Sequence, residues 1–451
     1  MIKIPPAKII EQRSHIVPGK LKITEYFFEV PTHWHKPDSR PLRLFARSAR
    51  KAETPADPTT SSDSDSPGDA KAKQQLPWLV FFQGGPGFGC RSPQDVAWTH
   101  QALDRGYQVL MLDQRGTGLS SPVSASALGL RGDDELQATY LKSFRADSIV
   151  RDAEAVRLAL TEGWPEEKRK WSVAGQSFGG FCITSYLSFY PEGLREAFYF
   201  GGLPPLVSGP DEVYERTFKK VVERNEAYYR KYPEDVKRVK DVVKLLRKFG
   251  DSTLGINFGF HGGFDAVHDL ILRCSNDLAV FGHLTRPTTS LIEQTMPFDD
   301  HIIYAILHEP IYCQGKPAQW SAHRIQQKYA QFSLDKTDDS PIYFTGEMVF
   351  PWMLTDYTEL RSLAKVGELL AQTSDWPALY DEEQLAKNEV PSYAAVYMED
   401  MYVDYDFSMQ TARKIKGCKP FVTNVMYHDA VRSRMDEVWR NIWALRDEVI
   451  D

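Results

Sequence analysis

The feature that most constrains the fold is a series of short apolar runs with helical patterns between them. Residues 77–85 (PWLVFFQGG), 107–116 (YQVLMLDQRG) and 171–180 (WSVAGQSFGG) are the clearest, and their apolar character is continuous, as in strands that are buried on both faces. An amphipathic helical pattern covers residues 145–162, and a fourth run follows at 196–205. This alternation predicts an α/β fold with a mostly parallel central sheet and helices on both of its faces.

The chain on the N-terminal side of these runs has a different character. Residues 20–50 alternate between apolar and polar positions in two stretches separated by a polar, proline-containing segment, which predicts an antiparallel hairpin or meander. Residues 51–75 are rich in Ser, Asp, Pro and Ala and nearly lack large apolar side chains. Such a segment cannot bury enough surface to offset its ordering entropy, so we expect a disordered insertion there.

Beyond residue 205 the strand pattern gives way to long, charged helical stretches. Acidic residues are interleaved with the basic ones, which favours solvated helix faces over a site for a polyanion. We expect residues 205–340 to form a helical cap inserted into a catalytic domain made of residues 1–204 and 341–451. The runs expected to complete the sheet are 340–348 (SPIYFTGEM), 392–401 (SYAAVYMEDM) and 419–428 (KPFVTNVMYH).

Bulk composition narrows the possible partners. The 451 residues are 42% hydrophobic and 25% charged, with a formal net charge of −7, so no electrostatic footprint for nucleic acid or an anionic membrane is expected. No stretch approaches the roughly 18 apolar residues of a membrane span, and the first twenty residues lack the apolar core of a secretory signal. The five scattered cysteines form no CxxC pair, which favours a reduced, cytoplasmic chain without a metal cage.

One pentapeptide, Gly175-Gln176-Ser177-Phe178-Gly179, carries the strongest chemical signal. It has the G-x-S-x-G pattern and lies between a buried strand and a helical stretch. That context is typical of the nucleophile elbow of the α/β-hydrolase fold, a sharp turn that exposes a serine hydroxyl. We therefore predict Ser177 to be a nucleophile and the fold to be an α/β-hydrolase fold with an inserted helical cap.

A serine nucleophile needs a base and an acid, which in this fold follow it in the order Asp or Glu, then His. His428 is the one histidine in the last hundred residues and directly follows an apolar run, so we predict it to be the base. Asp400 is the preferred acid because it lies just after the apolar run 393–398 (YAAVYM), where a strand should stop. The neighbouring carboxylates remain alternatives; they are Glu399, Asp404 and Asp406.

The developing oxyanion needs backbone donors. Phe178 directly follows the nucleophile, and its N–H is predicted to be one donor. The glycine-rich loop Gln83-Gly84-Gly85-Pro86-Gly87 should supply the other, and because Pro86 has no N–H we predict Gly85 or a neighbouring glycine. Loss of one such donor typically lowers the rate by ~10²–10³.

Six motifs follow one another along the chain: GGPG (84–87), DQRGTGLS (113–120), GQSFGG (175–180), HEPIYCQG (308–315), GEMVFPWM (346–353) and EDMYVD (399–404). Together and in this order they resemble those of the proline iminopeptidases (prolyl aminopeptidases), in particular the larger bacterial and fungal form with a long helical cap. The resemblance implies an enzyme that removes N-terminal proline from small peptides without metal or cofactor, and it supports Asp400 as the acid. One departure is Gln83, where the family often has histidine.

Exopeptidase action also needs a carboxylate for the substrate's N-terminal ammonium. Glu309 and Glu347 are candidates because each lies in an apolar, aromatic stretch, although either could instead form a buried ion pair. The resemblance favours Glu309 as the main anchor and Glu347 as a supporting group. Tyr312 and Trp352, with Phe350, are candidate walls of a pocket for the proline ring.

The sequence-based hypothesis is thus a serine exopeptidase that releases proline through an acyl-enzyme. Its substrate would be a small peptide with a free N-terminal proline. The alternatives are an esterase or amidase of the same fold acting on small acyl compounds, and a hydrolase-like binding protein without catalysis.

Overall fold

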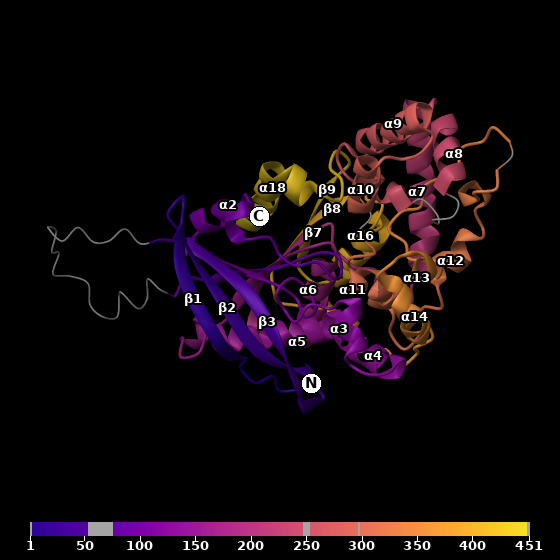
Figure 1. Cartoon of the computed structure of the whole chain (residues 1–451). Coiled ribbons are helices and arrows are strands. Elements are labelled where there is room, and N and C mark those ends of the chain that lie inside the picture. The colour runs from indigo at the N-terminus through magenta and orange to yellow at the C-terminus, as the bar shows by residue number, and fades with distance from the viewer. Residues whose placement is uncertain (1, 53–74, 247–252, 296–297, 337, 449–451) are drawn as a thin grey trace.

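A computed structural model describes residues 2–52, 75–246, 253–295, 298–336 and 338–448 (Figure 1). Most of the insertion expected at 51–75 lies outside the described residues. Within them, the core of the molecule is one nine-stranded sheet of order β1-β2-β3-β5-β4-β6-β7-β8-β9. Its strands are β1 (Lys8–Val17), β2 (Leu21–His33), β3 (Lys36–Lys51), β4 (Trp78–Phe82), β5 (Gln108–Leu112), β6 (Trp171–Gln176), β7 (Leu194–Phe200), β8 (Ser392–Tyr397) and β9 (Cys418–Thr423).

The sheet has two parts of different topology. Strands β1, β2 and β3 form an antiparallel meander, in which β2 pairs with β3 from Leu21↔Lys51 to His33↔Lys36. Strand β3 then joins β5 antiparallel, and from β5 through β9 every neighbouring pair is parallel. The predicted hairpin and the mostly parallel sheet are therefore confirmed. Strand β1 was not predicted, because nearly all its side chains are exposed and it lacks a buried alternation.

Both faces of the parallel strands are covered, which explains their continuous apolar runs. Val80, Leu110 and Val173 face one hydrophobic cluster that includes α5 and α6. The intervening Leu79 and Val109 face a second cluster that includes Trp residues of α2 and α18. The helices outside the cap are α2 (Trp98–Asp104), α3 (Ala125–Gly129), α4 (Asp134–Leu141), α5 (Ala146–Leu160), α6 (Phe178–Phe189), α16 (Tyr405–Lys414), α17 (Ala430–Ser433) and α18 (Met435–Asp447).

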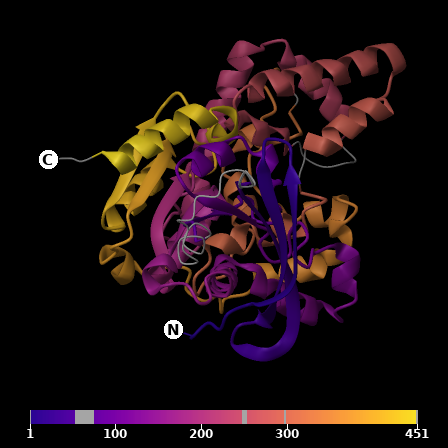
Figure 2. The ribbon, with the colours of Figure 1, turned by 90° about the vertical axis from the view of Figure 1, so that its left-hand side faces the viewer.

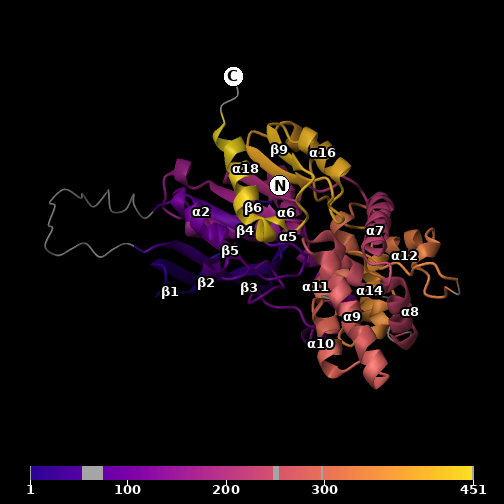
Figure 3. The same cartoon turned by 90° about the horizontal axis from the view of Figure 1, so that it is seen from above.

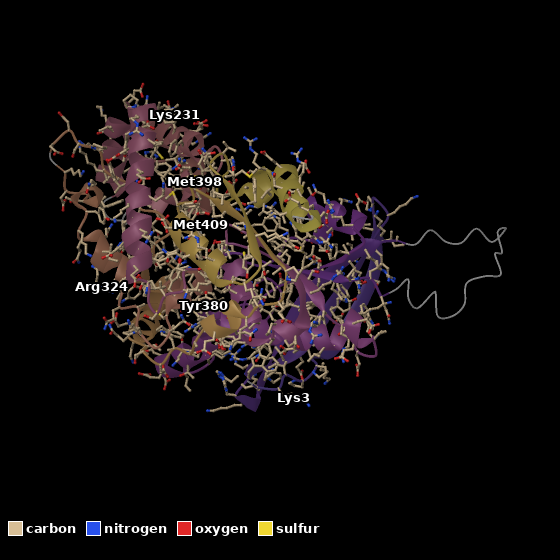
Figure 4. All side chains as sticks on the ribbon, turned by 180° about the vertical axis from the view of Figure 1, so that it is seen from behind. Lys3, Lys231, Arg324, Tyr380, Met398 and Met409 are labelled. Carbon is tan, nitrogen blue, oxygen red and sulfur yellow. The ribbon has the colours of Figure 1, made fainter. Side chains whose placement is uncertain are left out.

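A long helical excursion separates the adjacent parallel strands β7 and β8. In Figures 1 and 3 its helices gather at one end of the sheet, away from β1 and β2. Seen from behind, helix α7 runs along this part, with Lys231 at its upper end and Arg324 and Tyr380 toward the lower end (Figure 4). The helices are α7 (Asp211–Lys231), α8 (Asp235–Leu246), α9 (Gly263–Phe281), α10 (Arg286–Thr295), α11 (Ile302–Leu307), α12 (Ser321–Gln326), α13 (Met353–Asp356), α14 (Ala364–Ala371) and α15 (Glu382–Ala386).

The prediction that residues 340–348 return to the sheet is wrong. The segment is irregular, and its backbone forms hydrogen bonds with side chains of α7 rather than with a neighbouring strand. Asn225 accepts from the Phe344 N–H at 2.8 Å and donates to the Phe344 carbonyl at 2.9 Å. The sheet resumes only at Ser392, and the proposed domain limits at 204/205 and 340/341 stay a prediction.

The C-terminal helix α18 and the N-terminal meander lie on different sides of the molecule (Figure 2). The loops that follow β4, β6, β8 and β9 come from the carboxyl ends of parallel strands, and such ends meet at one edge of a sheet. Ser177, Asp400 and His428 follow β6, β8 and β9 at this edge.

Candidate active site

The turn between β6 and α6 has the geometry of a strained elbow. Ser177, its central residue, has φ 55° and ψ −126°, which a non-glycine residue rarely adopts. The chain can turn this sharply only because its neighbours lack a Cβ. A Cβ on Gly179 would lie 2.0 Å from the Phe82 carbonyl oxygen, and one on Gly180 would lie 2.2 Å from that of Gly202. The two glycines therefore let α6 pack directly against the ends of neighbouring strands.

Asp400 and His428 meet at the ends of β8 and β9. His428 Nδ1 and Asp400 Oδ2 are 2.8 Å apart, and both side chains are buried. The other carboxylate oxygen, Oδ1, accepts the backbone N–H groups of Tyr402 and Val403 at 2.9 and 3.0 Å. With Nδ1 bonded to Asp400, Nε2 is the ring nitrogen that can exchange a proton with the nucleophile or the substrate.

The rival carboxylates are placed elsewhere. Glu399 is half-buried, and its Oε2 lies 3.5 Å from Lys220 Nζ. Asp404 caps α16 by accepting the Phe407 N–H, and Arg216 contacts both Asp404 and Asp406. Among the candidate acids, the structure thus brings only Asp400 to His428.

Burial and charge act in opposite directions on the His428 imidazole. Desolvation acts to lower its pKa, but the adjacent Asp400 carboxylate outweighs it, and the net pKa is raised from the ordinary value. Gln176 Nε2 donates to the His428 carbonyl at 3.4 Å. The hydrogen bonds of the described residues do not include one from Ser177 Oγ to His428, and such bonds often tighten only when substrate binds.

Ser177 and His428 line one cavity of about 390 Å³, hereafter the catalytic cavity. Gly84 and Gly85 form part of its wall, as expected of an oxyanion loop. Phe178 is the first residue of α6, so its N–H is one of those that a helix leaves without an intrahelical acceptor. Both predicted oxyanion donors thus come from segments beside Ser177.

The loop that carries Gly85 is held by Asp113. One Asp113 oxygen accepts the Cys90 N–H at 2.7 Å, and the other accepts the Leu119 N–H at 2.9 Å. Gln114 Nε2 adds a bond to the Gln83 carbonyl at 3.0 Å. The neighbouring Arg115 does not contribute to this loop, because its guanidinium pairs with Asp152 of α5.

Of the two predicted ammonium anchors, Glu347 lines the catalytic cavity. Tyr304 donates to its Oε1 at 2.5 Å, and no Lys or Arg forms an ion pair with it among the described residues. Burial raises the pKa of Glu347, and the nearby His428 and the Tyr304 hydroxyl partly offset this effect, so that the resulting pKa is about 7.

Glu309 has a different environment. It is buried in the short helix η6 (Glu309–Tyr312), and its two oxygens accept the backbone N–H groups of Ser321 and Ala322 at 3.1 and 2.9 Å. Burial raises its pKa to about 8, although these donors act in the opposite direction. Glu309 is not part of the lining of the catalytic cavity. Its contacts are with the start of α12 instead.

The predicted aromatic walls are also set back from the cavity lining. Tyr312 is buried against Phe181, with ring centroids 5.8 Å apart. Trp352 stacks on Phe350 at 5.8 Å. The aromatic residues that do line the catalytic cavity are Phe88, Phe260, Tyr304 and Tyr402.

Sequence reasoning did not find Tyr304, Tyr402 or Arg432, which also line the cavity. Tyr402 packs on the His428 ring at 4.5 Å, and its hydroxyl donates to the Ile256 carbonyl, which joins the acid-bearing loop to the cap. Tyr402 lies in the EDMYVD motif, so a signal for it was present. Tyr304 and Arg432 lie in segments without a recognisable motif.

The described residues contain no group of three or more His, Cys, Asp or Glu side chains placed to hold a metal ion. None of the described helices combines the length and the apolar character needed to cross a membrane.

Comparison with known proteins agrees with this arrangement. Residues 77–331 match the family model of the alpha/beta hydrolase fold. Proline iminopeptidase aneH of Aspergillus aculeatus is 45% identical over 460 residues, which cover 99% of each chain. Proline iminopeptidase of Aeromonas sobria is 36% identical over 435 residues, or 93% of this chain and 95% of the relative. The predicted fold class and family are confirmed: the chain belongs to the α/β-hydrolase fold family and, within it, to the proline iminopeptidases.

Proposed function

We propose that this chain is a serine exopeptidase that releases N-terminal proline from short peptides. One observation carries the proposal: within the described residues, a serine elbow, the histidine of a His–Asp pair and a half-buried carboxylate that forms no ion pair with Lys or Arg line one cavity. The relatives named proline iminopeptidase, alike over nearly the whole chain, support the same reaction.

The first half of the reaction makes an acyl-enzyme. Ser177 Oγ attacks the carbonyl carbon of the N-terminal proline while His428 Nε2 takes the hydroxyl proton. Asp400 keeps the other ring nitrogen protonated and stabilises the imidazolium. The N–H groups of Gly85 and Phe178 receive the oxyanion, and His428 then gives its proton to the departing amine.

The second half returns the enzyme to its starting state. Water attacks the prolyl ester, His428 takes a proton from that water, and Ser177 Oγ leaves with the proton from His428. Proline is released with a new carboxylate. No cofactor is required by these steps.

Glu347 is the carboxylate that we assign to the substrate's ammonium group. It faces the same cavity as Ser177, and an ammonium in this site would lower its raised pKa through a charge-assisted hydrogen bond. Glu309, the main anchor expected from the sequence, lies behind the lining and holds α12. Recognition of a charged N-terminus is what separates an aminopeptidase from an esterase or amidase with the same triad.

The test compares proline naphthylamide with its N-acetylated form, using wild type and Ser177→Ala. We expect wild type to cleave the free form and to leave the acetylated form nearly untouched. Ser177→Ala should lose at least about 10³-fold in kcat because the nucleophile is gone.

Unchanged hydrolysis by a folded Ser177→Ala protein would refute the serine mechanism. Preference for acetylated substrates or simple esters would favour the esterase or amidase. No reaction of wild type with a fluorophosphonate probe would favour a binding protein.

A further inference from the structure

Arg432 lies where the catalytic cavity meets a second one. The second cavity has a volume of about 380 Å³ and is formed by the loop after β4, helix α2 and the start of the C-terminal helices. We call it the neighbouring cavity. Gln83, Phe88, Gln176 and Arg432 line both, so the two cavities adjoin each other and Arg432 is part of their shared wall.

A second arginine, Arg91, lines the neighbouring cavity. The two guanidinium groups are close enough for Arg91 to lower the pKa of Arg432, in addition to the larger effect of desolvation. Arg432 as a whole is exposed, so the desolvation that lowers its pKa comes from atoms packed around the guanidinium group. Two cations that repel each other at the wall of a cavity favour an anion between them.

The protein itself does not supply that anion. In the part of the chain that the structure describes, neither Arg91 nor Arg432 forms an ion pair or a side-chain hydrogen bond. Asp429 is the carboxylate that most favours the Arg432 charge, but it is bonded to the N–H and the Nδ1 of His261, at 3.1 and 2.7 Å. Asp95 also lines the neighbouring cavity and lies beyond ion-pair distance of both arginines.

Arg432 and Glu347 have different charged neighbours. The charges of His428 and Asp400 affect the pKa of Glu347, whereas those of Asp429 and Arg91 affect the pKa of Arg432. His428 in turn responds to both Glu347 and Arg432. The catalytic cavity is thus lined by an acidic group and a basic group as well as by His428, and these charges complement those of a short zwitterionic peptide.

We propose that Arg432, assisted by Arg91, binds the C-terminal carboxylate of a short peptide substrate on the leaving-group side of Ser177. This specificity role rests on the proposed peptidase function. A guanidinium suits it because it can bind a carboxylate through two parallel hydrogen bonds. Since Arg432 lines the same cavity as Ser177, the carboxylate that reaches it belongs to a peptide of only a few residues.

The experiment measures kcat/KM for proline dipeptides and longer proline peptides, each as the free acid and as the C-terminal amide. In wild type we expect the shortest free acids to exceed their amides by about 10-fold or more, the value of a charge-assisted bond. The ratio should fall toward one as the peptide lengthens. In Arg432→Gln the ratio for the shortest peptides should fall to about one, and in Arg91→Gln it should fall in part.

Arg434→Gln is the matched control, because Arg434 lies two residues away and pairs with Glu437 on the surface. It should keep the wild-type ratio. Because the ratio is taken within each variant, a general loss of activity or a change at His428 cancels.

Two results would overturn the inference while leaving the peptidase intact: a wild-type ratio near one, or a ratio that Arg432→Gln does not change. Proline naphthylamide has no carboxylate and therefore tests the peptidase alone. If wild type fails to cleave it, the proposed function fails and this inference fails with it.

Discussion

Glu347 shows how one residue's environment sets its chemistry. Its side chain is half-buried, bonded to the Tyr304 hydroxyl and near His428, and desolvation of the carboxyl group raises its pKa to about 7. Near neutral pH it therefore exists in both protonation states. Only the ionised state can form a charge-assisted hydrogen bond with a substrate ammonium.

The pH dependence of kcat/KM for proline naphthylamide tests this role. Both Glu347 and His428 must lose a proton to act, so activity should rise steeply with pH up to about 7. Glu347→Gln should lower kcat/KM and make the acid limb less steep, from about two protons toward one. Glu399→Gln, which breaks an ion pair with Lys220 outside the lining of the catalytic cavity, should keep the wild-type profile. An acid limb of equal slope in Glu347→Gln would contradict the assignment.

At the scale of elements, Glu309 connects two short helices of the cap. It lies at the start of η6 and binds the first two N–H groups of α12 through both carboxylate oxygens. Because α12 has only six residues, it leaves most of its N–H groups without intrahelical partners. Glu309 therefore acts on α12 as a capping group supplied from elsewhere in the chain.

Glu309→Gln replaces one accepting oxygen with an amide nitrogen that cannot accept a backbone N–H. We expect the free energy of unfolding to fall by about 1–3 kcal/mol, the cost of a buried unsatisfied donor. Urea denaturation measures this loss, and the free-to-acetylated substrate preference measures ammonium binding. Glu309→Gln should affect mainly the first quantity and Glu347→Gln mainly the second. The reverse pattern would restore Glu309 as the main anchor.

On the scale of the whole molecule, Arg115 and Asp152 join three parts of the fold. The Arg115 guanidinium binds both Asp152 oxygens in α5, and it also donates to the carbonyls of Thr32, at the end of β2, and of Ser143. Both side chains of the pair are almost completely buried, at 0% and 3% exposed. The antiparallel meander, the loop after β5 and helix α5 are thereby fixed to one another.

Asp152→Ala would leave the Arg115 charge buried without its partner. We expect a loss of about 3–5 kcal/mol in the free energy of unfolding at pH 7. Asp375→Ala provides the control because Asp375 pairs with Lys142 at the surface, where such pairs contribute about 1 kcal/mol or less. Urea denaturation measures the loss in each variant. Equal losses would show that burial does not determine how much the Arg115–Asp152 pair contributes to the free energy of unfolding.

Much of this protein could be predicted from its sequence because the signals are local. The buried strands, the hairpin at 20–50 and the elbow around Ser177 each depend on residues that are neighbours in the chain. The order of Ser177, Asp400 and His428 could also be predicted, since strand ends of a parallel sheet meet at one edge. The structure brings Asp400 and His428 together at that edge.

Other features were decided only when distant segments packed together. Residues 340–348 have the apolar pattern of a strand, but Asn225 takes the place of a neighbouring strand. Glu309 and Glu347 look alike in sequence, and only tertiary packing binds one to α12 and places the other in the lining of the cavity that contains Ser177. The role proposed for Arg432 depends on its proximity to Arg91, which is distant in the sequence. A local pattern determines which element forms, whereas the environment of a charged group depends on every segment that packs around it.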